Sequence, residues 1–171
     1  MMESLKSVPV PREVRHPLFF TETDRVISVN YENPKPLNPC FSYEILYYNG
    51  ISGILFPWED LSAIKRGEEE WRVIRDNLNA AFSERSGRDI ILLMKKATAL
   101  FMMYLFWTNG LPANPSGWKE ELKGMAIKPV NAEERLEFIL TQPSLFHSYK
   151  QLNQLFIEQM KHFAKYLATH E

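Results

Sequence analysis

The residues that could perform catalysis are few in this chain, and the most suggestive pair is Ser144 and His147. They stand one helical turn apart at the start of the last periodic apolar segment. A serine beside a histidine could act as nucleophile and general base. No acidic third member is evident, and a serine at a helix start is expected to cap the helix. We therefore interpret the pair as structural.

The sequence also offers little for a metal or a nucleotide. His147 and His162 share one predicted helix but are separated by roughly 22 Å of rise, too far to bind one ion. Cys40 is the only cysteine, which excludes an internal disulfide and a cysteine-cluster zinc site. The seven glycines form no phosphate-cradling motif. We predict no catalytic residue, no metal and no cofactor.

The element that must organise any site is the segment from Asp89 to Thr108, which is apolar on nearly every face of a helix. A helix of this kind has to be surrounded by other elements. Lys95 and Lys96 lie inside it, and the uncharged remainder falls short of the roughly 20 residues of a membrane span. We therefore expect a buried core helix, no membrane, and only the outer surface available for binding.

The remaining patterns predict helices around this core. Residues 1–37 hold five prolines and should form an extended arm, in which Arg25–Tyr31 is a strand signal too isolated to make a sheet. Residues 38–171 should form one helical bundle domain. Its predicted helices begin at Asn38–Pro39, Pro57, Glu68, Asp89, Trp118, Asn131 and Ser144, with Gly50 ending the first, Gly67 ending the second and an Asn131–Glu134 capping box. The fold class is thus all-α, a bundle of about six helices with an N-terminal arm.

A partial helix-turn-helix spacing occurs around Ala63, Gly67 and Val73. Its second helix would begin with three glutamates, which would face the phosphates of DNA. Because DNA affinity depends on neutralising phosphates, we do not favour DNA reading through this element.

Charge is uneven along the chain although the formal net charge is −1. Residues 87–128 carry six basic and three acidic side chains, a balance of +3. This stretch could contact an acidic protein or nucleic acid, but a basic run of this kind is more often simply a solvated face. Tryptophan is enriched at interaction hot spots, although both tryptophans concerned could also pack in the core. The candidate interaction surface is Trp107, Asn109, Trp118, Lys119, Lys123, Lys128 and Arg135.

Four short segments carry a resemblance to a known family: Lys128–Ile139 (KPVNAEERLEFI), Phe41–Tyr47 (FSYEILY), Pro57–Trp58 and Gln151–Lys161 (QLNQLFIEQMK). Together they resemble the YpoC-like family of Bacillus-type Firmicutes. The genes of that family lie beside those of a primosomal protein and of endonuclease III. The resemblance thus implies, by association, a link to DNA replication or repair, and it implies no catalytic residue.

The leading hypothesis is a cytosolic, non-enzymatic interaction protein, accessory to DNA replication or repair, whose partner is another protein. Nucleic acid is the second candidate partner. The alternative is an enzyme whose pocket gathers scattered residues such as Tyr47, Tyr48, His147 and Arg135, since helical bundles can host such pockets.

Overall fold

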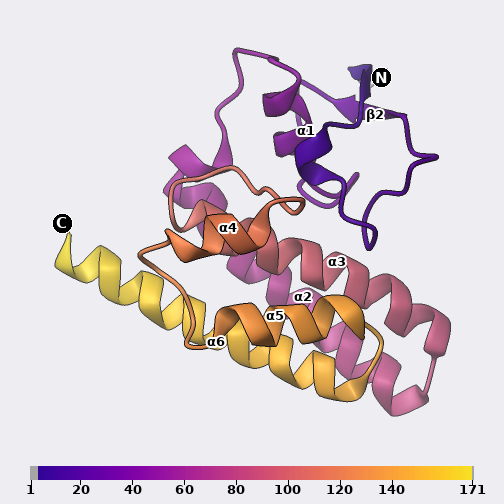
Figure 1. The fold of residues 1–171 in the computed structure, drawn as a ribbon, viewed down its shortest axis with the longest axis vertical. Coiled ribbons are helices and arrows are strands. Elements are labelled where there is room, and N and C mark those ends of the chain that lie inside the picture. Colours follow the sequence, from indigo (N-terminus) through magenta and orange to yellow (C-terminus); the bar gives the residue numbers. More distant parts are fainter. Residues whose placement is uncertain (1–3, 171) are drawn as a thin grey trace.

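The computed structural model describes residues 4–170, in which six α-helices and one two-stranded antiparallel sheet are formed (Figure 1). The predicted helical bundle is confirmed. The long helices α2, α3 and α6 lie alongside one another with α5 against α6, while α1 and the strands gather at one side of the bundle (Figure 1). The elements before the bundle are β1 (Leu5–Pro9), the 3-10 turn η1 (Arg12–Val14) and β2 (Val26–Asn30).

The prediction that the N-terminal arm contains no sheet is wrong. β1 and β2 pair antiparallel, with Ser7 opposite Ser28. β2 lies within the predicted strand signal of residues 25–31, but β1, which buries only Val8, shows no alternation from which a strand would be predicted. Their hydrogen bonds form only when two segments far apart in sequence meet, which local patterns do not reveal.

The first helix begins later than predicted. α1 spans Ser42–Tyr48 and follows Phe41, whose φ of 63° lies in the left-handed region. The Phe41 N–H donates to the Pro36 carbonyl oxygen at 2.9 Å, so the chain around Asn38–Pro39 forms a turn instead of the first helical turn. Gly50 closes the far end as predicted, with a φ of 75° that suits glycine.

The two helices predicted on either side of Gly67 are one continuous helix. Pro57–Glu59 forms only the 3-10 turn η2, after which α2 runs over Leu61–Glu84, capped by Asp60. Gly67 faces α3, where the nearest atom to an added Cβ would be Tyr104 Cδ2 at 3.7 Å. Because no turn interrupts α2, the helix-turn-helix spacing has no structural counterpart.

The central helix, α3, spans Gly87–Trp107, and every residue from 97 to 107 is buried. By length and composition α3 could cross a membrane, but 72% of its most apolar window is buried inside the fold. That burial is the pattern of a core helix. Trp71 of α2 stacks on Phe156 of α6 at 4.1 Å between ring centroids, and Phe101 of α3 meets the same ring edge-on.

The remaining helices are α4 (Trp118–Lys123), α5 (Ala132–Thr141) and α6 (Phe146–Thr169). α5 starts where predicted, but the expected capping box is absent. Asn131 adopts a left-handed φ of 53° and its side chain makes no capping hydrogen bond. The backbone bond from Arg135 N–H to the Asn131 carbonyl closes the first turn instead.

Candidate functional site

The two tryptophans of the predicted interaction surface lie in the core. Trp107 is 2% exposed and Trp118 is 5% exposed. The alternative of core packing therefore holds for both rings. Trp107 at the end of α3 and Trp118 at the start of α4 both belong to the hydrophobic core.

The lysines of that predicted surface are exposed but engaged. Lys119 Nζ lies 2.9 Å from Glu137 Oε2 on α5, and Lys123 Nζ lies 2.9 Å from Glu120 Oε1. Exposed pairs of this kind contribute little stability, yet they neutralise the charge that a partner would meet.

The other two cations serve as helix-end and inter-helix contacts. Lys128 Nζ donates to the Leu122 carbonyl at 3.1 Å, at the end of α4. Arg135 on α5 pairs with Glu158 on α6, with Nη1 to Oε1 at 3.0 Å, and also donates to Gln151. The hydrogen bonds from Arg135 lower the pKa of the Glu158 carboxyl, which keeps the pair ionised.

Asn109, also predicted at the surface, is an internal bridge. Its side-chain amide donates to the Ile127 carbonyl at 2.8 Å, and its Oδ1 accepts from the Ile127 N–H at 3.0 Å. It thereby fastens the loop after α4 to the end of α3.

The residues proposed for an enzyme pocket are not gathered in one place. Tyr47 and Tyr48 lie on α1, whereas His147 packs against Phe138 at the seam of α5 and α6. Arg135 lies in the same seam but is engaged with Glu158. No group of three or more metal-ligating side chains occurs within residues 4–170.

Ser144, which lies one helical turn before His147, does not cap a helix, contrary to the prediction. Ser144 is exposed and α6 begins only after Leu145. The buried Ser148 donates to the Gln142 carbonyl instead, which links the end of α5 to the start of α6.

A buried carboxylate, Glu44 of α1, lies against the end of α3. Its Oε2 accepts a hydrogen bond from Trp107 Nε1 at 2.7 Å and another from the Ala113 N–H at 3.1 Å. Its Oε1 has no partner within the described chain. One carboxylate oxygen thus ties together α1, α3 and the loop after α3.

Burial dominates the electrostatics of Glu44. Removal from water raises the pKa of this carboxyl from 4.5 to about 7, although the hydrogen bonds from Trp107 and Ala113 act in the opposite sense. The group therefore titrates near neutrality. No bound molecule can reach it through the surrounding core, since its exposure is 0%.

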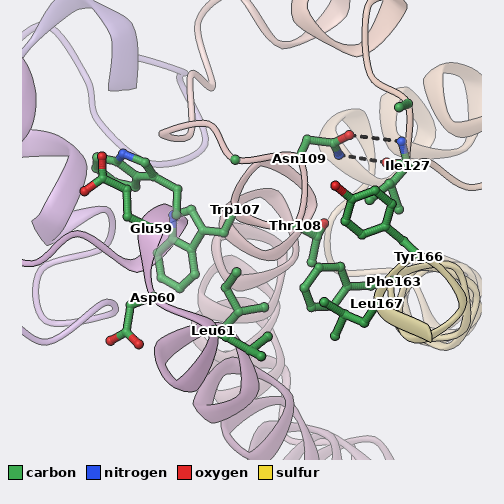
Figure 2. Close-up of a pocket in the computed structure, with 14 residues that line it drawn as sticks. Glu59, Asp60, Leu61, Trp107, Thr108, Asn109, Ile127, Phe163, Tyr166 and Leu167 are labelled. Atoms are coloured by element: carbon green, nitrogen blue, oxygen red, sulfur yellow. Dashed lines mark hydrogen bonds between the residues drawn. The ribbon is translucent and has the colours of Figure 1, made fainter. Parts of the chain in front are cut away.

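The end of α3 also borders an open hollow of about 370 Å³, which we call the end hollow (Figure 2). Its walls come from η2 and the start of α2, from the end of α3 and the residues that follow it, from the loop after α4, and from the last turns of α6. Figure 2 shows Phe163 and Leu167 projecting from α6 toward Leu61 of α2. Leu61 and Tyr166 are partly exposed at the mouth. The apolar lining is Trp58, Leu61, Ile64, Trp107, Phe163 and Leu167.

Thr108 and Asn109, two polar residues that line the end hollow, already have internal partners. Thr108 Oγ1 donates to the Tyr104 carbonyl at 2.8 Å and accepts from Gln159 Nε2 at 2.9 Å. The amide of Asn109 is used by Ile127 (Figure 2). The hollow therefore offers mainly apolar contact, and its charged groups are the carboxylates of Glu59 and Asp60.

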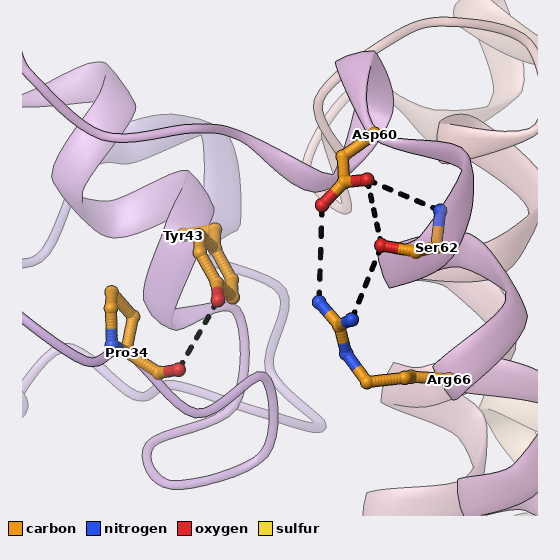
Figure 3. A network of polar contacts seen from close by, with 5 residues as sticks. All are labelled: Pro34, Tyr43, Asp60, Ser62 and Arg66. Atoms are coloured by element: carbon orange, nitrogen blue, oxygen red, sulfur yellow. Dashed lines mark hydrogen bonds and ion pairs between the residues drawn. The ribbon is translucent and has the colours of Figure 1, made fainter.

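A second hollow, of about 410 Å³, lies between residues 33–36 and the start of α2; we call it the strap hollow. Tyr43 on one side donates to the Pro34 carbonyl at 3.2 Å, while Arg66 on the other is held by Ser62 Oγ at 3.3 Å and by Asp60 at 3.9 Å (Figure 3). Trp107 borders both hollows.

Glu44 and Gln159 were missed among the residues that organise this region, although each leaves a signal. Glu44 interrupts an apolar and aromatic run, and Gln159 sits three residues after Phe156 and four before Phe163, on the buried stripe of α6. A polar residue on a stripe that faces the core indicates an internal hydrogen bond.

Comparison with known proteins confirms the resemblance found in the sequence. A family model described as "YpoC-like protein" matches residues 62–171. A curated relative from Bacillus subtilis (strain 168), described as "Uncharacterized protein YpoC", is 37% identical over 114 residues, which cover 66% of this chain and 70% of the relative. No solved structure shows a significant match.

Proposed function

This chain belongs to the YpoC-like family, and we propose that it is a non-enzymatic interaction protein that holds a segment of a partner protein in the end hollow. The observation that carries the proposal is the composition of that hollow. Its walls are mainly apolar and aromatic, and the side chains of Thr108 and Asn109 in its lining are held by internal hydrogen bonds. Such a surface suits an apolar anchor and offers little to a chemical reaction.

The hollow has room for one large side chain of the partner. Its volume of about 370 Å³ lies at the lower end of the range for ligand sites. Leu61 and Tyr166 stand on opposite helices at the mouth, where they could clasp an entering aromatic or aliphatic group. Burial of that group would supply most of the affinity.

Charge at the mouth favours a basic neighbour for this anchor. The charged residues that line the hollow are Glu59 and Asp60. Asp60 is partly neutralised by Arg66 at 3.9 Å, which leaves Glu59 as the freer carboxylate. An acidic rim repels phosphates, so this hollow fits a basic and apolar protein segment better than nucleic acid.

We place the partner among the proteins of DNA replication or repair, in the cytosol. The support for this part of the proposal is the gene neighbourhood that the family resemblance implies. The residues that line the end hollow do not indicate the process in which the partner acts.

The alternative of an enzyme draws its support from the strap hollow, where Tyr43 and Arg66 converge on one space. Burial raises the pKa of the Tyr43 phenol, which keeps it protonated and unsuited to act as a base near neutrality. Arg66 is engaged with Ser62 and Asp60. The end hollow therefore remains the better supported site.

Selection from a displayed library of random peptides tests the proposal with the full chain as bait. We expect the enriched peptides to share a large apolar or aromatic residue beside an arginine or lysine. Re-selection on Leu61→Asp should lose them, whereas Val73→Asp, an exposed position of α2 outside the hollow, should retain them. Enrichment of acidic peptides, or peptides that ignore Leu61→Asp, would contradict the proposal.

A further inference from the structure

A third hollow lies between the N-terminal segment and α3, on different elements from the end hollow. It measures about 310 Å³, and we call it the hairpin hollow. Its walls are mainly apolar and come from the loop after η1, from β2, from the turn before α1 and from α3. The apolar lining includes Phe19, Phe20, Ile27, Leu37 and Leu92.

Two lysines of α3, Lys95 and Lys96, stand at this hollow. Neither forms an ion pair with a carboxylate in the part of the chain that the structure describes. Both lie close enough to Cys40 that their charges act to lower the pKa of its thiol, although burial raises that pKa more strongly. The two ammonium groups thus approach the same hollow from one helix.

The one carboxylate that lines the hollow is already bound locally. Asp24 Oδ2 accepts hydrogen bonds from the Thr21 N–H at 2.8 Å and from Thr21 Oγ1 at 3.2 Å. These bonds hold the pKa of the Asp24 carboxyl below its usual value, and the charge of Lys95 acts in the same direction, so Asp24 stays ionised in the hollow.

Lys95 and Lys96 differ in this respect from the lysines that follow α3 in the chain. Lys119 is paired with Glu137, Lys123 with Glu120, and Lys128 with backbone carbonyls. Among the cations of residues 87–128 that form no ion pair in the described part of the chain, Lys95 and Lys96 are the two that line the hairpin hollow. Exposed Leu92, one turn before Lys96, extends the apolar surface toward the lysines.

We propose that the hairpin hollow is a second docking site, which takes an acidic segment of a partner protein with an apolar side chain in the hollow and its carboxylates on Lys95 and Lys96. The apolar walls would anchor the segment, and the two cations would select acidic neighbours and exclude basic ones. Because two carboxylates line the end hollow, whereas two lysines and one carboxylate line the hairpin hollow, the two sites would accept segments of opposite charge. A protein with two such sites could join two different chains.

Fluorescence anisotropy with a defined peptide tests the site. The peptide is fluorescein-labelled and short, with aspartates preceding a leucine and a phenylalanine. We expect saturable binding to the full chain, which the double variant Lys95→Glu with Lys96→Glu weakens by roughly tenfold or more. Lys161→Glu with Lys165→Glu, an equal change of charge on exposed positions of α6, should leave the affinity unchanged.

Cys40 locates the bound peptide, because it is the single cysteine of the chain and lines the hollow. We expect saturating peptide to slow the alkylation of Cys40 by iodoacetamide, and Leu61→Asp to leave that protection intact. If the peptide still protects Cys40 from alkylation in Leu61→Asp, it binds at the hairpin hollow and not at the end hollow.

Three outcomes would overturn the proposal: no saturable binding of the acidic peptide, equal affinity in the Lys95 and Lys96 variant, or unprotected Cys40. A single-stranded oligonucleotide that binds more tightly than the peptide and competes with it would also overturn it, in favour of nucleic acid. Circular dichroism of each variant checks that it is folded, and exposed positions such as Lys96 should tolerate the change.

Discussion

Trp107 donates its indole N–H to Oε2 of Glu44 at 2.7 Å, inside a core where neither side chain meets solvent. This bond joins α1 to the end of α3, and the same tryptophan ring borders the end hollow and the strap hollow. This pair therefore holds α1 against the end of α3 at the tryptophan that borders both hollows.

Replacement of Glu44 by glutamine should change how stability depends on pH. The folded-state pKa of Glu44 is raised from 4.5 to about 7, so its contribution is fully present below 4.5 and is lost as the pH rises to about 7. The wild type should lose stability across this range relative to Glu44→Gln, by on the order of 3 kcal/mol.

Chemical denaturation of both proteins at several pH values measures this difference. Taking the difference between the two proteins removes the opposite trend of carboxyls such as Glu158, whose pKa is lowered by Arg135. Parallel stability curves for the two proteins would show that Glu44 is not protonated in the folded state near neutrality.

Replacement of Gly67 by alanine should stabilise the protein. Gly67 lies inside α2, and an added Cβ would meet only Tyr104 Cδ2, at an ordinary contact distance of 3.7 Å. Alanine is favoured over glycine within a helix by about 0.5–1 kcal/mol. Thermal unfolding should show a higher melting temperature for Gly67→Ala and a lower one for Gly50→Ala, because Gly50 has a φ of 75°. A loss of stability in Gly67→Ala would indicate that α2 is broken at this position.

Replacement of Trp118 by alanine should act on stability. The ring is 5% exposed, and truncation of a buried tryptophan costs about 3–5 kcal/mol. Lys119→Ala, which removes only an exposed ion pair with Glu137, should stay within about 0.5 kcal/mol of the wild type. Urea denaturation compares the two. If Trp118→Ala unfolds at the wild-type midpoint, the ring belongs to the surface after all.

Much of the bundle could be predicted because its signals are local. The apolar run that became α3 and the stripe of α6 through Leu152, Phe156 and Phe163 specify buried helices without knowledge of their neighbours. The prediction that a helix ends at Gly67 is wrong because glycine also occurs inside helices. The β1–β2 hairpin was missed because its pairing joins residues about twenty positions apart.

The hollows could not be predicted because each is formed by elements remote in sequence. The end hollow needs Leu61, Trp107 and Phe163 to meet, and no spacing in the chain indicates that they do. The pairing of charged side chains could not be predicted either. Composition predicted a basic middle segment, but only the packed structure shows that Lys119 and Lys123 are paired while Lys95 and Lys96 are not.

Calorimetric titration tests whether the end hollow holds the partner segment. A selected basic and aromatic peptide is titrated into the wild type, Leu61→Asp and Val73→Asp. An aspartate at position 61, the first residue of α2, suits the helix start and should not unfold the protein. We expect Leu61→Asp to bind the peptide at least roughly tenfold more weakly than the wild type does, and Val73→Asp to bind it equally well. Equal affinity for all three proteins would contradict the claim that the end hollow is the site where the partner is held.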